Sequence, residues 1–218
     1  MYEHIDSWKN SKEAFDQQVA LNIKELNKGF PAHWQHFVGY VQRNHDIDRI
    51  IDVGCGAGAY GYISKKLNKN YIGYDYSEYA INVANRTWEP ELKKQTPNNT
   101  KTMNFYCKDY KELTEAENPD TDLLVANAIC DVLPNGDECL EFLLGLKYRN
   151  LLIQRVSLVE ESEYSEEYQA YNITTYKFHH NKNKTISAIE DMGYSVNIVH
   201  LYETTHDLEI TLNGWYKI

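Results

Sequence analysis

The feature that most constrains this chain is a short apolar strand that runs directly into a cluster of glycines. The stretch IIDVGCGAGAYG covers residues 50–61, and a segment of helical character continues from it. Glycines at such a strand-to-helix junction let backbone N–H groups approach a ligand without interference from a Cβ atom. From about residue 49 onward, strand-like and helix-like segments alternate. The alternation predicts an α/β fold, a doubly wound sheet with helices on both faces.

The separate segments of this alternation can be placed from local signals. Thr121–Asn127 is apolar almost throughout, which suits a strand buried on both faces. Ser77 can cap a helix that carries Ile81, Ala84 and Trp88 on one face. The other expected strands are Arg49–Val53, Asn70–Asp75, Thr102–Asp109 and Arg149–Leu158. The other expected helices are Ala59–Leu67, a helix with the stripe Cys139, Phe142, Leu143 and Leu146, and Lys184–Met192 with Ile186 and Ile189 on one face.

The C-terminal end of the chain predicts a different strand pairing. Tyr194–Glu203 and His206–Ile218 look like two successive strands with a very short connection. A parallel crossover needs a dozen or more residues, so these two strands must pair antiparallel. We therefore expect a parallel sheet that ends in an antiparallel strand.

The N-terminal segment ahead of the sheet predicts two helices. Apolar residues repeat there at helical spacing, first as Phe15, Val19, Ile23, Leu26 and Phe30, and after Pro31 as Trp34, Phe37, Val38 and Val41. We expect residues 1–47 to form a helical extension or lid and residues 48–218 to form one α/β domain. Within that domain, residues 157–181 form an insert after the fifth strand, on the substrate side.

The glycine cluster fits two nucleotide-binding patterns. Gly56, Gly58 and Gly61 match G-x-G-x-x-G, the pattern of a dinucleotide-binding loop, whereas residues 52–58 match D-x-G-x-G-x-G. Both patterns require an acidic residue at the end of the second strand, and Asp75 supplies it. The second pattern is favoured, because its first glycine follows the last apolar residue of the strand and because a dinucleotide-binding sheet does not usually end in an antiparallel strand. No group for hydride transfer stands out.

In this second pattern the chain resembles the class I S-adenosylmethionine-dependent methyltransferases, and in particular their small-molecule, type 11/12-like branch. The resemblance rests on the ordered motifs IIDVGCGAG, YIGYD, FYCKDY and LLVANAICDVLPN, and it covers roughly residues 48–218. It implies a Rossmann-like sheet of seven strands with the last one antiparallel, and S-adenosylmethionine as the cofactor. The cofactor-binding residues that it implies are Asp52, Gly54, Cys55, Gly56, Gly58, Asp75, Tyr76, Asp109, Tyr110, Asn127 and Ala128.

Each of these residues also has a purely structural interpretation. Asp75 can serve a turn, Asp109 can cap a helix that begins at Tyr110, and Asn127 can be a turn residue. The chain also departs from the small-molecule branch, because Val132 stands where that branch often has a histidine. The chain also lacks the N/D-P-P-Y sequence with which similar amine- and base-methylating enzymes hold a planar nitrogen, and the resemblance therefore disfavours methylation of a nucleobase or amide nitrogen.

Methyl transfer to a hydroxyl group is helped by a general base. His179 and His180 are the first candidates because imidazole titrates near neutrality, and Asp131 is the second. His33 and His36 are further candidates if the N-terminal helices form a lid. In the insert, residues 164, 168 and 171 are tyrosines, and at helical spacing they would line one helix face over a small polar acceptor such as a sugar.

Composition and charge limit the kinds of molecule that this chain is expected to bind. The net charge of −10 and the scattered 22 Lys and Arg residues disfavour nucleic acid, and no apolar run is long enough to span a membrane. The polar N-terminal residues do not resemble a signal peptide, and the four cysteines lack C-x-x-C spacing, so we expect a cytoplasmic protein. No metal site stands out, and the oligomeric state is open. The sequence predicts O-methylation of a small molecule; the alternatives are an NAD-dependent oxidoreductase and a non-catalytic binding domain, with a protein or RNA substrate disfavoured.

Overall fold

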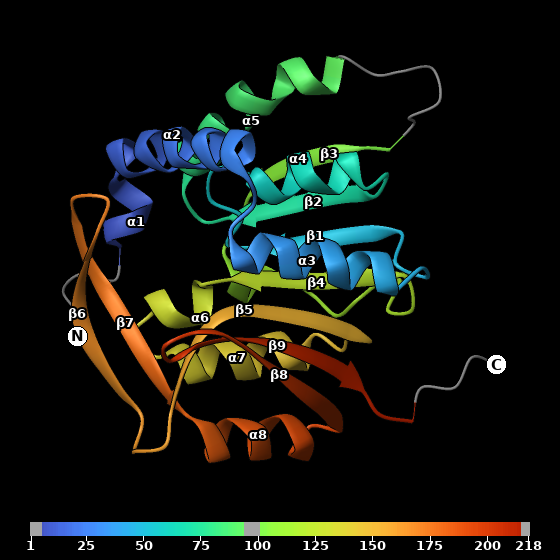
Figure 1. Ribbon diagram of the computed structural model, residues 1–218, viewed down its shortest axis with the longest axis vertical. Helices are drawn as coiled ribbons and strands as arrows, with labels where there is room; N and C mark the ends of the chain where they lie inside the picture. Colours follow the sequence, from blue (N-terminus) through green and yellow to red (C-terminus); the bar gives the residue numbers. More distant parts are fainter. Residues whose placement is uncertain (1–5, 94–100, 215–218) are drawn as a thin grey trace.

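The computed structural model of the chain describes residues 6–93 and 101–214 and contains one mixed sheet of nine strands (Figure 1). The strands are β1 (Arg49–Val53), β2 (Asn70–Asp75), β3 (Met103–Cys107), β4 (Asp122–Asn127), β5 (Asn150–Val159), β6 (Tyr164–Ala170), β7 (Ile173–Asn181), β8 (Tyr194–Tyr202) and β9 (Thr205–Leu212). The helices are α1 (Ser7–Asn10), α2 (Lys12–Lys28), α3 (Ala32–Arg43), α4 (Ala59–Lys66), α5 (Glu78–Lys93), α6 (Ile129–Val132), α7 (Gly136–Gly145) and α8 (Lys182–Asp191), with a 3-10 turn η1 (Tyr110–Glu112).

Seven of the nine strands form the sheet that the sequence predicts. Their order is β3-β2-β1-β4-β5-β9-β8, in which the first five strands are parallel and β9 lies antiparallel between β5 and β8. The antiparallel ending is therefore confirmed, and it separates this sheet from the all-parallel order of dinucleotide-binding domains. The expected C-terminal strand is described only as far as Leu212, and residues 215–218 lie outside the described part of the chain.

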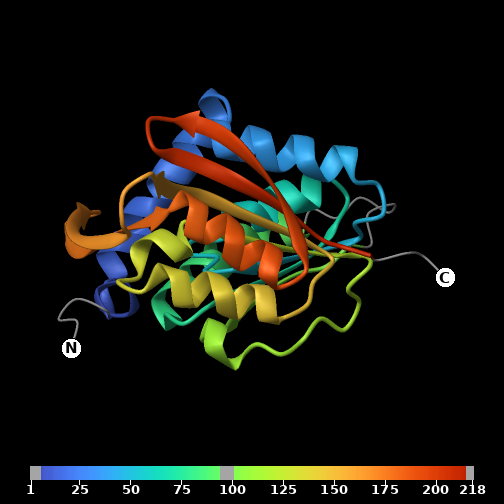
Figure 2. The ribbon, with the colours of Figure 1, turned by 90° about the horizontal axis from the view of Figure 1, so that it is seen from below.

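Helices cover both faces of the sheet, and each face has its own hydrophobic core (Figure 2). On one face α3, α4 and α5 pack on Ile50 and Val125, and Trp34, Phe37 and Trp88 are buried in this core. On the other face α7 and α8 pack on the alternate residues of the same strands. Because both faces are covered, the central strands are buried apolar runs, as expected for a parallel sheet.

The insert after β5 differs from the prediction, because it forms a β-hairpin and not a helix. Strands β6 and β7 pair antiparallel across the two-residue turn formed by Tyr171 and Asn172. Both turn residues have positive φ (50° and 64°), as in a type I′ turn, whose twist matches that of the flanking strands. The carboxyl-terminal end of β7 pairs parallel with the end of β5, so the hairpin extends the sheet beside the strand ends.

The N-terminal helices pack at the carboxyl-terminal edge of the parallel strands and over one face of the sheet, and α2 crosses the strand ends (Figure 1). Phe15 is buried, and Leu26 and Phe30 pack on the core, as their spacing predicts. Ile23 departs from the predicted stripe and is exposed. Among the residues described here, no helix combines the length and the apolar character needed to cross a membrane.

Candidate functional site

A cavity of about 1000 Å³ lies at the carboxyl-terminal ends of β1, β2, β4 and β5. Helix α2 and the start of α3 form one wall, and the tip of the β6–β7 hairpin forms another. This edge of an open α/β sheet is where ligands bind in such folds. The volume lies at the upper end of the range for small-molecule sites, which leaves room for two ligands side by side.

The glycine loop after β1 forms the floor of the cavity. Gly54 and Gly56 line it with positive φ angles of 73° and 51°, and Cys55 lies between them. The N–H groups of Gly54 and Cys55 both donate to the carbonyl of Tyr74, at 2.8 and 2.9 Å, and thereby fix the loop on β2. Gly58 does not line the cavity: a Cβ atom there would lie 2.6 Å from Phe105, so this glycine serves packing.

Asp75 at the end of β2 ties the two neighbouring loops together. Its carboxylate accepts hydrogen bonds from the N–H groups of Gly56 and Ser77, both at 2.9 Å. Burial raises its pKa to about 6, although these two backbone hydrogen bonds oppose the shift. The side chain lines the cavity, and at neutral pH it presents a buried carboxylate there.

Two buried acceptor atoms that line the same cavity have no hydrogen-bond partner among the described residues: Asp52 Oδ1 and Asn127 Oδ1. The other carboxylate oxygen of Asp52 accepts from the hydroxyl of Tyr71 at 2.6 Å. Burial raises the pKa of Asp52 to about 7. Because an unpaired buried acceptor is costly, the pair indicates that a ligand donates hydrogen bonds here.

The remaining predicted cofactor residues also lie around this cavity. Tyr76, Asp109, Tyr110 and Ala128 all line it. Asp109 also caps the turn η1, where it accepts from the N–H of Lys111 at 2.9 Å, so its predicted capping role is confirmed.

The general bases that the sequence favours first do not line the cavity. His179 is buried in the hairpin, where Nδ1 lies 2.9 Å from Ser157 Oγ and Nε2 lies 3.0 Å from Glu166. His180 is also buried, which lowers its pKa to about 4. Asp131 accepts from the backbone N–H of Ser157, and burial raises its pKa to about 8. The structure brings these three groups together with Ser157 behind the cavity wall, because the insert is a strand pair.

Of the two further histidine candidates, one reaches the cavity. His33, at the start of α3, lines it, and burial together with the charge of Arg155 lowers its pKa to about 3. His36 lies one turn further along α3, where it contacts Asp207 at 2.5 Å and Glu209 at 2.7 Å and does not line the cavity. Although burial opposes the shift, these two hydrogen bonds raise the pKa of His36.

Two of the cavity-lining side chains that no sequence pattern singles out are Gln18 and Arg155. Gln18 of α2 accepts from the N–H of Ala57 at 2.6 Å and so closes over the glycine loop. Arg155 of β5 brings a positive charge to the end of the cavity that lies away from the glycine loop. Gln18 lies in an amphipathic helix and Arg155 in an apolar strand, and neither local pattern indicates a ligand-binding residue.

The hairpin and the N-terminal helices contact each other over the cavity. Trp8 of α1 donates from its indole nitrogen to Thr175 of β7 at 3.0 Å, and its ring lies edge-on to Tyr171 at 5.6 Å. Of the three insert tyrosines predicted to face the acceptor, Tyr168 and Tyr171 line the cavity, from a hairpin and not from a helix. Tyr164 does not line it, and its ring stacks on His179 at 4.4 Å.

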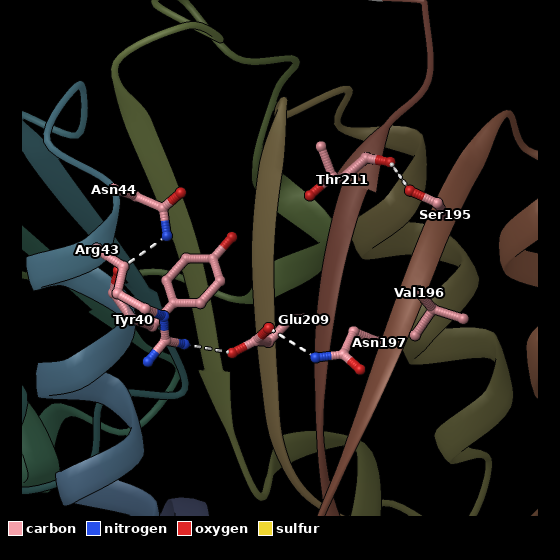
Figure 3. Close-up of a pocket in the computed structure, with 8 residues that line it drawn as sticks. All are labelled: Tyr40, Arg43, Asn44, Ser195, Val196, Asn197, Glu209 and Thr211. Carbon is pink, nitrogen blue, oxygen red and sulfur yellow. Dashed lines mark hydrogen bonds and ion pairs between the residues drawn. The ribbon is translucent and has the colours of Figure 1, made fainter.

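A second, smaller pocket of about 360 Å³ lies between α3 and the antiparallel strands β8 and β9 (Figure 3). Its central carboxylate, Glu209, accepts from Arg43 at 2.8 Å and from Asn197 at 2.9 Å. The charged groups of this pocket are therefore already paired with one another. In the described part of the chain, no group of three or more His, Cys, Asp or Glu side chains is placed to hold a metal ion.

Comparison with known proteins agrees with this geometry. A family model described as a methyltransferase domain matches residues 44–198. No curated protein matches the sequence. Among solved structures, the fold is similar to the magnesium protoporphyrin IX methyltransferase of Synechocystis with bound S-adenosylmethionine, with a TM-score of 0.62 and 16% identity over 82% of this chain and 77% of that one.

Two further structures have the same fold. A methyltransferase from Clostridium acetobutylicum, described as S-adenosylmethionine-dependent, gives a TM-score of 0.62 at 10% identity, over 92% of this chain and 99% of that one. An amino pentose methyltransferase from Micromonospora echinaspora, involved in calicheamicin biosynthesis and solved with S-adenosylmethionine, gives 0.59 at 9% identity over 88% and 95%.

Proposed function

The chain belongs to the methyltransferase domain family and has the fold of S-adenosylmethionine-dependent methyltransferases, and on this premise we propose that it transfers a methyl group from S-adenosylmethionine to an oxygen of a small polar molecule. One observation carries the proposal. The glycine loop, the Asp75 carboxylate and the two unpaired acceptors, Asp52 Oδ1 and Asn127 Oδ1, converge on one large cavity.

The donor and acceptor groups around the cavity fit this cofactor. Asp75 is a buried carboxylate at the end of the second strand, where it can accept hydrogen bonds from ribose hydroxyl groups. Asp52 and Asn127 offer oxygens to the ammonium group of the methionine part. Gly54 and Gly56 leave the loop free of Cβ atoms beside it. Asp109, Tyr110 and Tyr76 then lie where an adenine ring would be held.

When bound, the cofactor supplies a methyl group on a positively charged sulfur, which is already a good leaving group. The residues of this chain then have to position the acceptor, exclude water and receive one proton. The aromatic side chains Trp8, Trp34 and Tyr171 shield the cavity on the side of the N-terminal helices and the hairpin. His33 is our candidate for the proton acceptor, because it is the one predicted base that lines the cavity. Burial and the charge of Arg155 lower its pKa to about 3, which makes it a weak base until an anion pairs with Arg155.

The nature of the acceptor follows from the walls of the cavity. Tyrosine rings with hydroxyl groups, an arginine and a neutral histidine suit a small polar organic molecule. Hydroxyl oxygen is favoured over amide or nucleobase nitrogen because the chain has no N/D-P-P-Y sequence.

The four cysteines are free thiols, which supports a reducing, cytoplasmic setting for the enzyme.

Calorimetric titration with S-adenosylmethionine, S-adenosylhomocysteine and NAD tests the proposal. We expect both sulfur compounds to bind the wild-type protein and NAD not to bind. Asp75→Ala should weaken this binding by about 100-fold, because hydrogen bonds to a charged group contribute roughly 1.5–3 kcal/mol each. Asp16→Ala is the matched control, since Asp16 is an exposed carboxylate that pairs with Arg86 and does not line the cavity.

Asp75 also holds two backbone N–H groups, so folding of Asp75→Ala must be checked separately by circular dichroism and urea denaturation. Asp75→Asn, which keeps one acceptor oxygen, should lose affinity while keeping more of the stability. Tight binding of NAD, or unchanged affinity for S-adenosylhomocysteine in a folded Asp75→Ala, would contradict the proposal.

A further inference from the structure

Strand β5 contains a bulge at the point where it reaches the cavity. Ile153 pairs with Leu208 and Val156 pairs with His206, so Gln154 and Arg155 together face the single residue Asp207 of β9. Such a bulge inserts one extra residue into a strand and re-aims a side chain. Side chains of a regular strand alternate between the two faces of the sheet, so Ile153 and Arg155 would share a face. Ile153 and Val156 instead point into the same hydrophobic core, and Arg155 is the residue displaced from that face.

A buried carboxylate holds this bulge in place. Asp207 is fully buried, and its Oδ1 accepts from the backbone N–H of Arg155 at 2.9 Å. Its Oδ2 accepts from the side chain of Gln154 at 2.6 Å and lies 2.5 Å from His36 Nδ1. Gln154 in turn accepts from the hydroxyl of Tyr60 at 2.7 Å. The backbone at Arg155 is therefore fixed from several sides.

The conformation that results is unfavourable for an arginine. Arg155 has a φ of 61°, in the left-handed region that glycine tolerates best. Ala128, whose N–H donates to the carbonyl of Gln154 at 2.9 Å, has a φ of 65°. Both residues line the cavity. Backbone strain of this kind concentrates at functional sites, where a side chain is needed in a position that a relaxed backbone does not reach.

The guanidinium of Arg155 has no ion pair or side-chain hydrogen bond with any other residue in the ranges 6–93 and 101–214. Its positive charge acts on His33, Tyr171 and Asp131, which places it between the start of α3 and the hairpin. Two of the three lysines that line the cavity lie at its other end, beside Tyr76 and Tyr110. Lys9 Nζ is 5.9 Å from the centre of the Tyr76 ring, and Lys111 Nζ is 5.6 Å from the centre of the Tyr110 ring.

We propose that the methyl acceptor carries a carboxylate and that Arg155 binds it, with Tyr168 and Tyr171 beside the acceptor. A planar guanidinium matches a carboxylate with two parallel hydrogen bonds. One guanidinium balances one negative charge, whereas a phosphate would bring nearly two into a cavity that already holds the Asp75 carboxylate. The inference rests on the proposed function, because it names the substrate class of the same site.

The test compares acids with their amides in the presence of saturating S-adenosylhomocysteine. The probes are 4-hydroxybenzoate against 4-hydroxybenzamide, glucuronate against glucuronamide, and 4-hydroxyphenyl phosphate as the dianionic member. Binding is measured by calorimetry on wild type, Arg155→Gln, Arg155→Lys and the control Arg86→Gln, whose arginine is exposed and pairs with Asp16.

We expect the acid of at least one pair to bind wild type and Arg86→Gln at least tenfold more tightly than its amide. Arg155→Gln should abolish this preference, and Arg155→Lys should keep only part of it, because an ammonium group cannot make the paired hydrogen bonds. Affinity for S-adenosylhomocysteine should change less than threefold in both Arg155 variants.

The inference is overturned if no acid binds, if acid and amide bind equally in both pairs, or if the preference survives in Arg155→Gln. Tighter binding of the phosphate also contradicts it. If Arg155→Gln loses affinity for S-adenosylhomocysteine, the arginine binds the carboxylate of the cofactor and not that of the acceptor. If wild type itself does not bind S-adenosylhomocysteine, the proposed function fails first, and the two failures are thereby distinguished.

Discussion

The two ends of the cavity are built in opposite ways. At the end formed by β1 and β2, the left-handed backbone positions are glycines, such as Gly54 and Gly56. At the end formed by β4 and β5, the left-handed positions are Ala128 and Arg155, both of which carry a Cβ atom. The first end presents backbone and buried carboxylates, and the second presents side chains held in strained positions.

This difference indicates what each end has to recognise. A cofactor with fixed chemistry can be bound by backbone N–H groups and a few acceptors, which are compatible with glycine. An acceptor is distinguished from similar molecules by specific side chains, and these have to be directed into the cavity. The bulge in β5 does this for Arg155, and the hairpin does it for Tyr168 and Tyr171.

The largest effect is expected at the glycine end, from Gly58→Ala. Gly58 has a φ of 77°, and a Cβ atom there would lie 2.6 Å from Phe105 and 2.9 Å from Ala84. Left-handed strain and overpacking together should lower the free energy of unfolding by about 3 kcal/mol. Urea denaturation at constant pH measures this change.

Gly145→Ala is the matched control for that substitution. Gly145 ends α7, and a Cβ atom added there would have no neighbour within 4 Å. The change should be neutral or should stabilise the protein by up to about 1 kcal/mol, because alanine is the better helix former. If both variants were equally stable, the glycine loop would not depend on its glycines, and the contrast between the two ends would lose its basis.

A smaller effect of opposite sign is expected at the strained end, from Arg155→Gly. Glycine tolerates a φ of 61°, so the free energy of unfolding should rise by about 0.5–1 kcal/mol, after allowance for the greater flexibility of glycine in the unfolded chain. The same variant should lose the preference for acids over amides. Urea denaturation combined with the acid and amide titrations measures both effects.

Ala128→Gly sharpens this prediction, because Ala128 has a similar φ of 65° in the same cavity but no charged group. It should gain a similar amount of stability and keep the preference for acids. If Arg155→Gly instead destabilised the protein, the arginine would be a packing residue, and the strain would not be retained for binding.

The first four strands and the glycine loop could be predicted from sequence because their signals are local. Asn70–Asp75 is found with the predicted bounds, since an apolar run ends at a capping serine, and Asp75 then follows from its place at the strand end. The antiparallel pairing of β8 and β9 was also local, because a two-residue connection permits nothing else.

The insert could not be assigned correctly because its pattern is ambiguous. Tyr164 and Tyr168 are four residues apart, and residues at this spacing share a face in a helix and in a strand alike. Tyr171 lies in the turn itself, which lacks the Asn-Gly sequence typical of such hairpins. The residues of β7 that favour strands, from Ile173 to Thr175, were the signal that favoured a hairpin.

At the end of the cavity formed by β4 and β5, the positions of the side chains depend on contacts between distant parts of the chain. Arg155 reaches the cavity because of a bulge held by Asp207, which lies far along the sequence on β9. His179 is directed away from the cavity by the pairing of β7 with β5. No local pattern around these residues encodes either outcome.

The separation of the two ends can be tested most directly by hydrogen–deuterium exchange with and without S-adenosylhomocysteine. The account predicts slower exchange in residues 54–57, 75–77 and 109–111, where backbone N–H groups donate to the side chains of Asp75, Gln18 and Asp109. Exchange in the hairpin, residues 164–178, should change little. Protection confined to the hairpin and β5, with the glycine loop unchanged, would contradict the account.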